Sequence, residues 1–270
     1  MSEPTIFDHG SDPNFLSYYA DSSVSDNTLG RFTRTRNNIL RLLARVRGTD
    51  GPLRVADIGC GAGTCSQLWA KLGHSVHGLD VNAPLIELAG SRAAEAGLPI
   101  EFRVGSATQL PYADAQMDVV LLPELLEHVA DWELCLKEAA RVLAPGGLLF
   151  LSTTNALCPI QDEFDLPMYS WYPGPVKRYY ERLSVTTRPE LVRHTKYPAV
   201  HWFSFYQLRD YLARLGLDSL DRFDAADDRK FSVKGRAALR LIRRVPLARW
   251  IAHVLTPDVT IYAINRSARA

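Results

Sequence analysis

The sequence predicts an α/β protein with a largely parallel sheet that is covered by helices on both faces. Between residues 53 and 154, short runs of β-branched residues and leucine alternate with stretches of helical periodicity, as βαβ units do. The first of these strands ends in a glycine-rich turn that opens a helix, a second feature of such units. With 270 residues and 47% hydrophobic side chains, the chain can build one large core.

The expected elements follow the change from strand to helix periodicity. Pro84 suits the first turn of a helix, Gly73 and Gly97 suit helix ends, and a Pro-Gly-Gly turn at 145–147 precedes the fifth strand. The expected strands span residues 53–58, 75–80, 100–104, 117–122, 148–153, 217–223 and 259–266. The expected helices span residues 30–46, 64–73, 84–96, 131–143 and 204–216, the first with Ile39, Leu40, Leu43 and Val46 on one face.

We expect a single domain, residues 1–270, in which inserted segments cap the core. Residues 155–203 are rich in proline and aromatic side chains without steady periodicity, and residues 225–257 are basic and amphipathic. The expected segments are an N-terminal helical cap (1–52), a ligand-binding core (53–154), a first cap insertion (155–203), core (204–224), a basic insertion (225–257) and the last strand (258–270).

Composition and charge narrow the class of protein. The balance of 31 basic and 30 acidic side chains argues against a nucleic-acid partner. No apolar run reaches the roughly 18 to 20 residues of a membrane-spanning helix, and the first residues lack the features of a signal peptide. We therefore expect a cytoplasmic protein. Four scattered cysteines without a CxxC pair are read as structural thiols: Cys60, Cys65, Cys135 and Cys158.

The glycine turn indicates the chemistry of its ligand. Gly59, Gly61 and Gly63 are spaced as GxGxG, and Asp57 directly precedes them. A carboxylate there would repel the pyrophosphate of a dinucleotide and attract an ammonium group. This favours S-adenosylmethionine, which has an ammonium group and no phosphate. Asp80, at the end of the second strand, suits hydrogen bonds from ribose hydroxyls, or alternatively a helix N-cap.

Four motifs between residues 53 and 154 resemble those of the class I S-adenosylmethionine-dependent methyltransferases. They are VADIGCGAGT, the strand-end Asp80, GSATQLPYADAQMDVV and RVLAPGG, in that order. The resemblance implies a Rossmann-like seven-stranded mixed sheet of order 3-2-1-4-5-7-6, with strand seven antiparallel. It also implies that Gly59, Gly61 and Gly63 line the methionine portion, that Asp57 lies near its amino group, and that Asp80 and Val81 hold the ribose and flank the adenine.

The segment GSA departs from the family pattern. Family members commonly have an aspartate where Ser106 stands, so the resemblance implies a weaker adenine contact or one from the backbone at Ala107. Tyr19 and Pro123 complete the expected cofactor site, with Tyr18 and Tyr19 closing over the sulfonium or packing in the core. S-adenosylhomocysteine is the expected product.

The stretch after the fourth strand suggests how an acceptor is activated. Its ExxEH pattern resembles that of the ubiquinone-biosynthesis O-methyltransferases, and the resemblance implies a divalent cation on Glu124, Glu127 and His128. The alternative, which we favour, is His128 acting without metal as base or pocket lining. His201 either faces the acceptor as a second catalytic histidine or is hydrogen-bonded within an aromatic cluster.

We therefore expect O-methylation of a small-molecule acceptor such as a quinol, a glycan precursor or a secondary metabolite. Methylation of nitrogen or carbon, or a non-catalytic cofactor-binding subunit, is the alternative. The first insertion suits a pocket wall or a homodimer contact. Residues 229–253 carry eight Lys or Arg and no acid, which suits a membrane-borne or other anionic substrate at a peripheral membrane surface. A solvated lid is the other reading of this segment.

Overall fold

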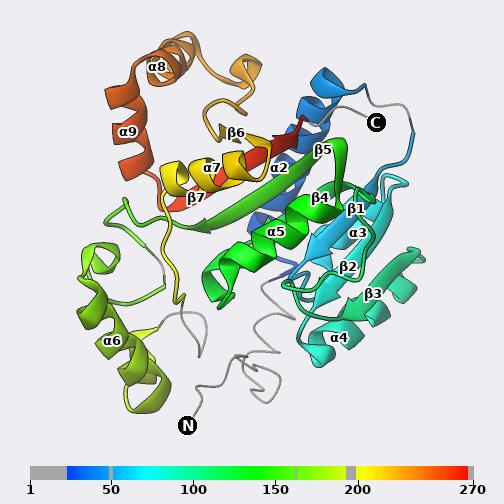
Figure 1. Ribbon diagram of the computed structural model, residues 1–270, viewed down its shortest axis with the longest axis horizontal. Helices are drawn as coiled ribbons and strands as arrows, with labels where there is room; N and C mark the ends of the chain where they lie inside the picture. The colour runs from blue at the N-terminus through cyan, green and yellow to red at the C-terminus, as the bar shows by residue number, and fades with distance from the viewer. Residues whose placement is uncertain (1–22, 49–50, 162, 193–198, 267–270) are drawn as a thin grey trace.

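A seven-stranded mixed sheet forms the centre of the molecule (Figure 1), with the order β3-β2-β1-β4-β5-β7-β6 that the sequence predicted. The computed structural model describes residues 23–48, 51–161, 163–192 and 199–266. Strands β1 to β5 are parallel, and β7 runs antiparallel to both β5 and β6. The strands are β1 (Arg54–Ile58), β2 (Ser75–Asp80), β3 (Ile100–Val104), β4 (Met117–Pro123), β5 (Leu143–Thr154), β6 (Leu217–Asp221) and β7 (Asp258–Asn265).

The helices of the core connect these strands and cover both faces of the sheet (Figure 1). They are α2 (Asp26–Val46), α3 (Thr64–Ala70), α4 (Ala83–Glu95), α5 (Trp132–Val142) and α7 (Phe205–Arg214), and the short 3₁₀ turn η1 (Leu126–His128) follows β4. None of the helices in the described part of the chain is both long and apolar enough to cross a membrane.

Strand β4 explains why its sequence is a continuous apolar run. Val119 and Leu121 point into the cluster that α2 and α3 cover, whereas Val120 and Leu122 point into the cluster under α5 and α7. A central parallel strand buried on both faces needs apolar residues at every position. The four cysteines of the chain are buried and form no disulfide.

The largest differences from the predicted boundaries are at the starts of α2 and β5. Helix α2 begins at Asp26 because Ser25 caps it, its hydroxyl accepting a hydrogen bond from the backbone nitrogen of Thr28. Strand β5 begins at Leu143, before the Pro-Gly-Gly turn, and the turn is a break in its register with β4. Gly147 permits this break, since a Cβ there would stand 2.8 Å from the carbonyl oxygen of Ala144.

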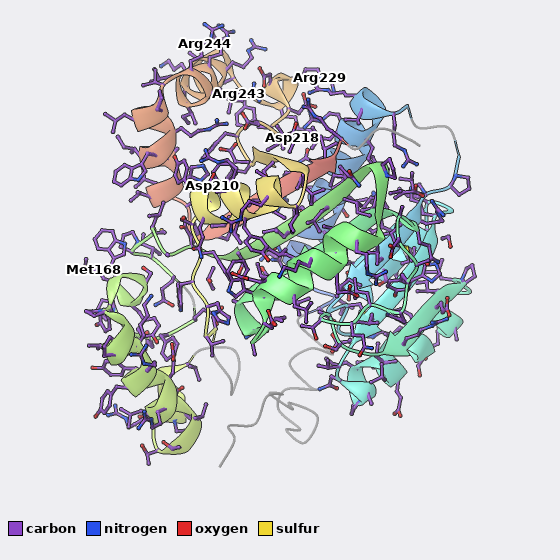
Figure 2. All side chains as sticks on the ribbon, viewed as in Figure 1. Met168, Asp210, Asp218, Arg229, Arg243 and Arg244 are labelled. Atoms are coloured by element: carbon purple, nitrogen blue, oxygen red, sulfur yellow. The ribbon has the colours of Figure 1, made fainter. Side chains whose placement is uncertain are left out.

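Two further groups of short helices lie outside the layers. The segment after β5 contains η2 (Tyr169–Trp171), α6 (Gly174–Thr186) and η3 (Pro189–Leu191), packed around Phe164 and Tyr169. The segment between β6 and β7 contains η4 (Asp228–Lys230), α8 (Val233–Arg244) and α9 (Pro246–Val254). Figure 2 labels Arg229 on η4 and Arg244 at the end of α8. The division into core and insertions stays a prediction.

Candidate functional site

The carboxyl ends of the parallel strands meet at one edge of the sheet, where ligands of open α/β folds bind. β1 runs there into the glycine turn, β2 ends in Asp80, and β4 is followed by the turn that carries residues 124–128. The candidate site is built from these three places.

The backbone conformation of the turn requires glycine at all three positions. Gly59, Gly61 and Gly63 have φ angles of 71°, 50° and 75°, in the left-handed region that favours glycine. At Gly63 a Cβ would also stand 2.8 Å from Cζ of Phe102. The turn therefore brings its backbone closer to neighbouring groups than any other residue would allow.

Asp57 is a buried carboxylate beneath this turn. Its Oδ2 accepts a 2.6 Å hydrogen bond from the hydroxyl of Ser66, while its Oδ1 has no partner among the described residues. Burial raises the pKa of Asp57 to about 6, although the bond from Ser66 opposes the rise. An ionised Asp57 is thus an incompletely compensated negative charge, which a nearby ammonium group would stabilise.

Asp80 holds the turn from the end of β2. Its Oδ2 accepts the backbone N–H of Gly61 at 2.8 Å, and its Oδ1 accepts that of Asn82 at 2.9 Å. Burial raises the pKa of Asp80, and these backbone bonds oppose it. Each carboxylate oxygen can accept more than one hydrogen bond, so Asp80 retains acceptor capacity for a hydroxyl. Val81 beside it is 53% exposed and offers an apolar surface.

The loop after β3 is fixed by an arginine that the sequence analysis left without a role. Arg141 on α5 donates to the carbonyl oxygens of Leu110 and Tyr112 at 3.1 and 2.8 Å, and it pairs with Glu138 and Asp114. The RVLAPGG motif contains this arginine, but no local pattern shows which loop it reaches.

At the start of that loop stands the residue that departs from the family pattern. Ser106 is exposed, with its hydroxyl 2.8 Å from that of Thr108, and Ala107 is buried. Ser106 therefore lacks the carboxylate that an aspartate would have here, and its hydroxyl interacts with Thr108 in the same loop.

The turn after β4 lies against the glycine turn. A Cβ added at Gly59 would stand 2.9 Å from Cδ1 of Leu125, so the two turns are in close contact. Glu124 follows Pro123 with a left-handed φ of 53° and forms an ion pair with Arg31 of α2. Sequence reasoning missed both Leu125 and Arg31, because a contact between distant segments leaves no local signal.

Glu127 turns the other way, into the protein. It is only 3% exposed, and its Oε2 accepts a 2.8 Å hydrogen bond from the hydroxyl of Thr153 on β5. Burial raises the pKa of Glu127 to about 8, so this carboxyl is mostly protonated at neutral pH.

The two carboxyl groups of the ExxEH pattern are therefore held by different elements, α2 for Glu124 and β5 for Glu127. Within the described ranges, no group of three His, Cys, Asp or Glu side chains is placed to hold a metal ion. The structure does not bring Glu124, Glu127 and His128 together as the three-ligand alternative requires.

The two histidines lie on adjoining segments. His128 closes η1, is half-buried, and donates its backbone N–H to Leu125 at 3.0 Å. The backbone N–H of His201 donates to the carbonyl oxygen of Glu127 at 3.2 Å, and its ring Nε2 lies 3.3 Å from the carbonyl oxygen of Ala130. Burial lowers the pKa of His201, which favours a neutral imidazole.

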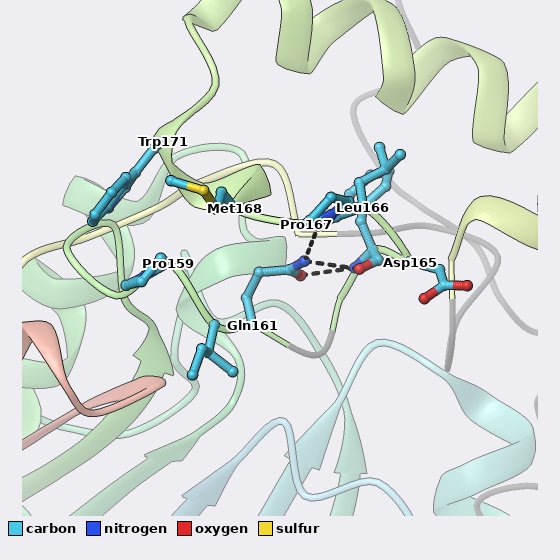
Figure 3. A pocket seen from close by; sticks show the side chains of 9 residues that line it. Pro159, Gln161, Asp165, Leu166, Pro167, Met168 and Trp171 are labelled. Carbon is cyan, nitrogen blue, oxygen red and sulfur yellow. Dashed lines mark hydrogen bonds between the residues drawn. The ribbon is translucent and has the colours of Figure 1, made fainter.

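A separate pocket of about 650 Å³ lies in the segment after β5 (Figure 3). The side chain of Gln161 shapes it, with Nε2 donating to the carbonyl of Phe164 at 2.8 Å and Oε1 accepting the N–H of the same residue at 2.8 Å. The wall is mainly apolar and includes Pro159, Ile160, Phe164, Leu166, Met168 and Trp171. Tyr18 and Tyr19, predicted to close over the cofactor, lie outside the described residues.

Known proteins are similar to this chain over the segment that contains the glycine turn and Asp80. Residues 56–151 match the family described as "Methyltransferase domain". The chain is 43% identical over 103 residues to a ubiquinone biosynthesis O-methyltransferase of Chelativorans sp., covering 38% of this chain and 41% of that protein. Its identity to the Brucella anthropi protein of the same name is 37% over 147 residues, 54% of each chain. The chain thus spans about half, or less, of the length of these curated relatives.

A solved structure shows the fold. The YcgJ protein from Bacillus subtilis has a TM-score of 0.53 and 18% identity, covering 86% of this chain and all of that one. The sheet order, the glycine turn and the match over residues 56–151 together place the core of the chain with the class I S-adenosylmethionine-dependent methyltransferases. Over the core, the chain is similar in sequence to the ubiquinone biosynthesis O-methyltransferases named above.

Proposed function

We propose that the protein transfers a methyl group from S-adenosylmethionine to a hydroxyl oxygen of a small molecule. The observation that carries the cofactor half of this proposal is the buried Asp57 beneath three left-handed glycines, with one oxygen unpartnered among the described residues. A ligand with an amino-acid tail and no phosphate suits this charge.

Different residues bind the different parts of S-adenosylmethionine. The turn at Gly59, Gly61 and Gly63 receives the methionine portion above Asp57, and Asp80 accepts hydrogen bonds from the ribose hydroxyls. Val81, Ser106, Ala107 and Pro123 form the surface around the adenine. When bound, S-adenosylmethionine supplies a methyl group on a sulfonium, which an aligned nucleophile attacks in line.

His128 is the proposed base for the acceptor hydroxyl. Its place in η1, three residues after Leu125, puts it on the turn that contacts Gly59. His201, on the segment hydrogen-bonded to Glu127, lines the acceptor side as a second candidate. Glu127 serves to hold η1 against β5, because its carboxyl is buried and bonded to Thr153.

The acceptor class rests on similarity and on the ExxEH pattern. The relatives are named for O-methylation in ubiquinone biosynthesis, which supports a quinol, with a glycan precursor or another secondary metabolite as further hydroxyl acceptors.

The test is formation of S-adenosylhomocysteine with a panel of catechols, phenols, sugars and amines, followed by mass spectrometry of the methylated product. A methylated phenol or alcohol with His128→Ala lowering kcat by about 100-fold or more, at unchanged affinity for S-adenosylhomocysteine, supports the proposal. Exclusive methylation of amines or carbon acids overturns the acceptor, and an activity removed by EDTA and restored by a divalent ion overturns the metal-free base.

A further inference from the structure

Helix α9 directs polar side chains into the protein and apolar side chains to the solvent, the reverse of an ordinary surface helix. Its polar residues Arg249 and His253 face the fully buried Asp221 at the end of β6. Nε of Arg249 and Nε2 of His253 each lie 3.0 Å from Oδ2 of Asp221. Burial alone would raise the pKa of Asp221, but the bond from His253 and the charge of Arg249 hold it below its usual value. The inward side of α9 is therefore held to the end of β6 by the contacts of Arg249 and His253 with Asp221.

The outward side of the same helix is apolar. Leu247 is 66% exposed, Trp250 47%, Ile251 45%, and Leu255, just past the end of the helix, 72%. These positions recur at intervals of three and four residues and so form one stripe. A contiguous stripe of this size facing water indicates a binding surface rather than scattered exposure.

Helix α8 and Val245, which follows it, add further exposed apolar side chains and exposed cations to this segment. Leu241 is 56% exposed and Val245 39%, and Arg240 and Arg244 are exposed beside them. In the described structure neither arginine forms a hydrogen bond or an ion pair. Free guanidinium groups beside an apolar stripe suit an anionic surface with an apolar interior.

The neighbouring arginine, Arg243, is bonded to the protein instead. Arg243 points inward and donates to the carbonyl oxygens of Phe223 and Ala226, each at 2.9 Å, and pairs with Asp228 at 2.8 Å. Figure 2 shows Arg244 at the end of α8 and Arg243 on the side of α8 that faces η4. Arg243 thus fixes the segment and adds no free charge.

The segment that leads from β5 to the apolar pocket is bonded to the end of α9. Nδ2 of Asn155 donates to the carbonyl oxygens of His253 and Thr256 at 2.8 and 2.7 Å, and Nε1 of Trp171 donates to Leu157 at 2.9 Å. Met168 lies on the same side of the molecule as α9 in Figure 2.

We propose that the α8–α9 face, meaning Leu241, Val245, Leu247, Trp250, Ile251 and Leu255 with Arg240 and Arg244, binds the surface of a bilayer that contains anionic phospholipids. The apolar side chains enter the boundary between headgroups and acyl chains, with Trp250 at that boundary, and the two arginines meet lipid phosphates. This goes beyond the proposed function, since it requires no turnover.

A second copy of the chain fits this face less well. In a two-fold dimer the same patch lies on both sides, so the free arginines of one copy would approach those of the other. Residues 229–253 contain no acidic side chain to separate them.

Flotation of the full chain with vesicles tests the proposal. Binding to phosphatidylcholine vesicles with about 30% phosphatidylglycerol, weakened by salt and absent with pure phosphatidylcholine, is expected. Arg240→Gln with Arg244→Gln should weaken binding about 20-fold or more, at about a fivefold loss for each cation. Leu247→Ser with Trp250→Ser should abolish binding.

The matched control is Arg34→Gln with Arg45→Gln, which removes two exposed cations from α2 and should leave vesicle binding unchanged. Each variant must retain the far-ultraviolet circular dichroism and S-adenosylhomocysteine affinity of the parent chain. Equal losses in the control and test pairs, no binding to anionic vesicles, or a dimer that the Leu247 and Trp250 substitutions dissociate would overturn the proposal.

Discussion

The ionisation of Asp57 makes cofactor affinity depend on pH in a way that can be calculated. Its pKa of about 6, compared with an ordinary value of 3.8, corresponds to a net cost of about 3 kcal/mol for the charged form, after the hydrogen bonds from Ser66 have offset part of the cost of burial. If the charged form binds the cofactor amino group, about a tenth of the protein is competent at pH 5 and about nine tenths at pH 7. Affinity for S-adenosylhomocysteine should therefore rise about tenfold between these values.

Calorimetry at several pH values, in two buffers of different ionisation enthalpy, measures both the affinity and the proton that binding releases below pH 6. Asp57→Asn should bind more weakly and remove the pH dependence. Ser66→Ala should move the midpoint to higher pH, because the hydrogen bond from Ser66 lowers the pKa of Asp57. A flat affinity profile for the parent chain, or an unchanged slope in Asp57→Asn, would refute the reasoning.

The remaining predictions concern stability and are measured by chemical denaturation. Because the pKa of Glu127 is raised to about 8, the free energy of unfolding should fall as pH rises from about 4.5 to 8. The fall between pH 5 and 7 is at most about 3 kcal/mol. Glu127→Gln should reduce this dependence of stability on pH. Gly63→Ala should destabilise by about 1 kcal/mol or more, because its φ is 75° and its Cβ would meet Phe102; a neutral result would contradict the argument for the turn. Asp118 is paired with Arg47 and Arg54, and its pKa is lowered because their hydrogen bonds and charge outweigh burial. Asp118→Asn should therefore cost about 2 kcal/mol at pH 7 and progressively less as pH falls below about 4, and a constant difference at all pH values would argue against the ion pairs.

The sheet order was predictable because four motifs in a fixed sequence identify the fold, and because strands such as β4 are apolar at every position. The start of β5 was not predictable, since Pro-Gly-Gly ordinarily ends an element and only pairing with Met117 keeps Leu143 in the strand. Local signals mark Gly59, Asp57 and Asp80, each next to the end of a strand.

The partners of the site residues were beyond the reach of the sequence. Glu124 with Arg31, and Glu127 with Thr153, are pairings between distant segments. The basic segment looked uniform in the sequence, yet Arg243 and Arg249 are internal braces whereas Arg240 and Arg244 are free in the described structure. Burial and pairing, which a single sequence does not display, separate these roles.

The position of β7 has a consequence for how the chain folds during synthesis. β7 follows β6 and the α8–α9 segment in the chain, but it lies between β5 and β6 in the sheet. β6 has no neighbouring strand until β7 has left the ribosome, so the two strands beyond β5 join the sheet late. During that interval β5 presents an open edge, and a ribosome stalled within α9 would hold the nascent chain in this vulnerable state.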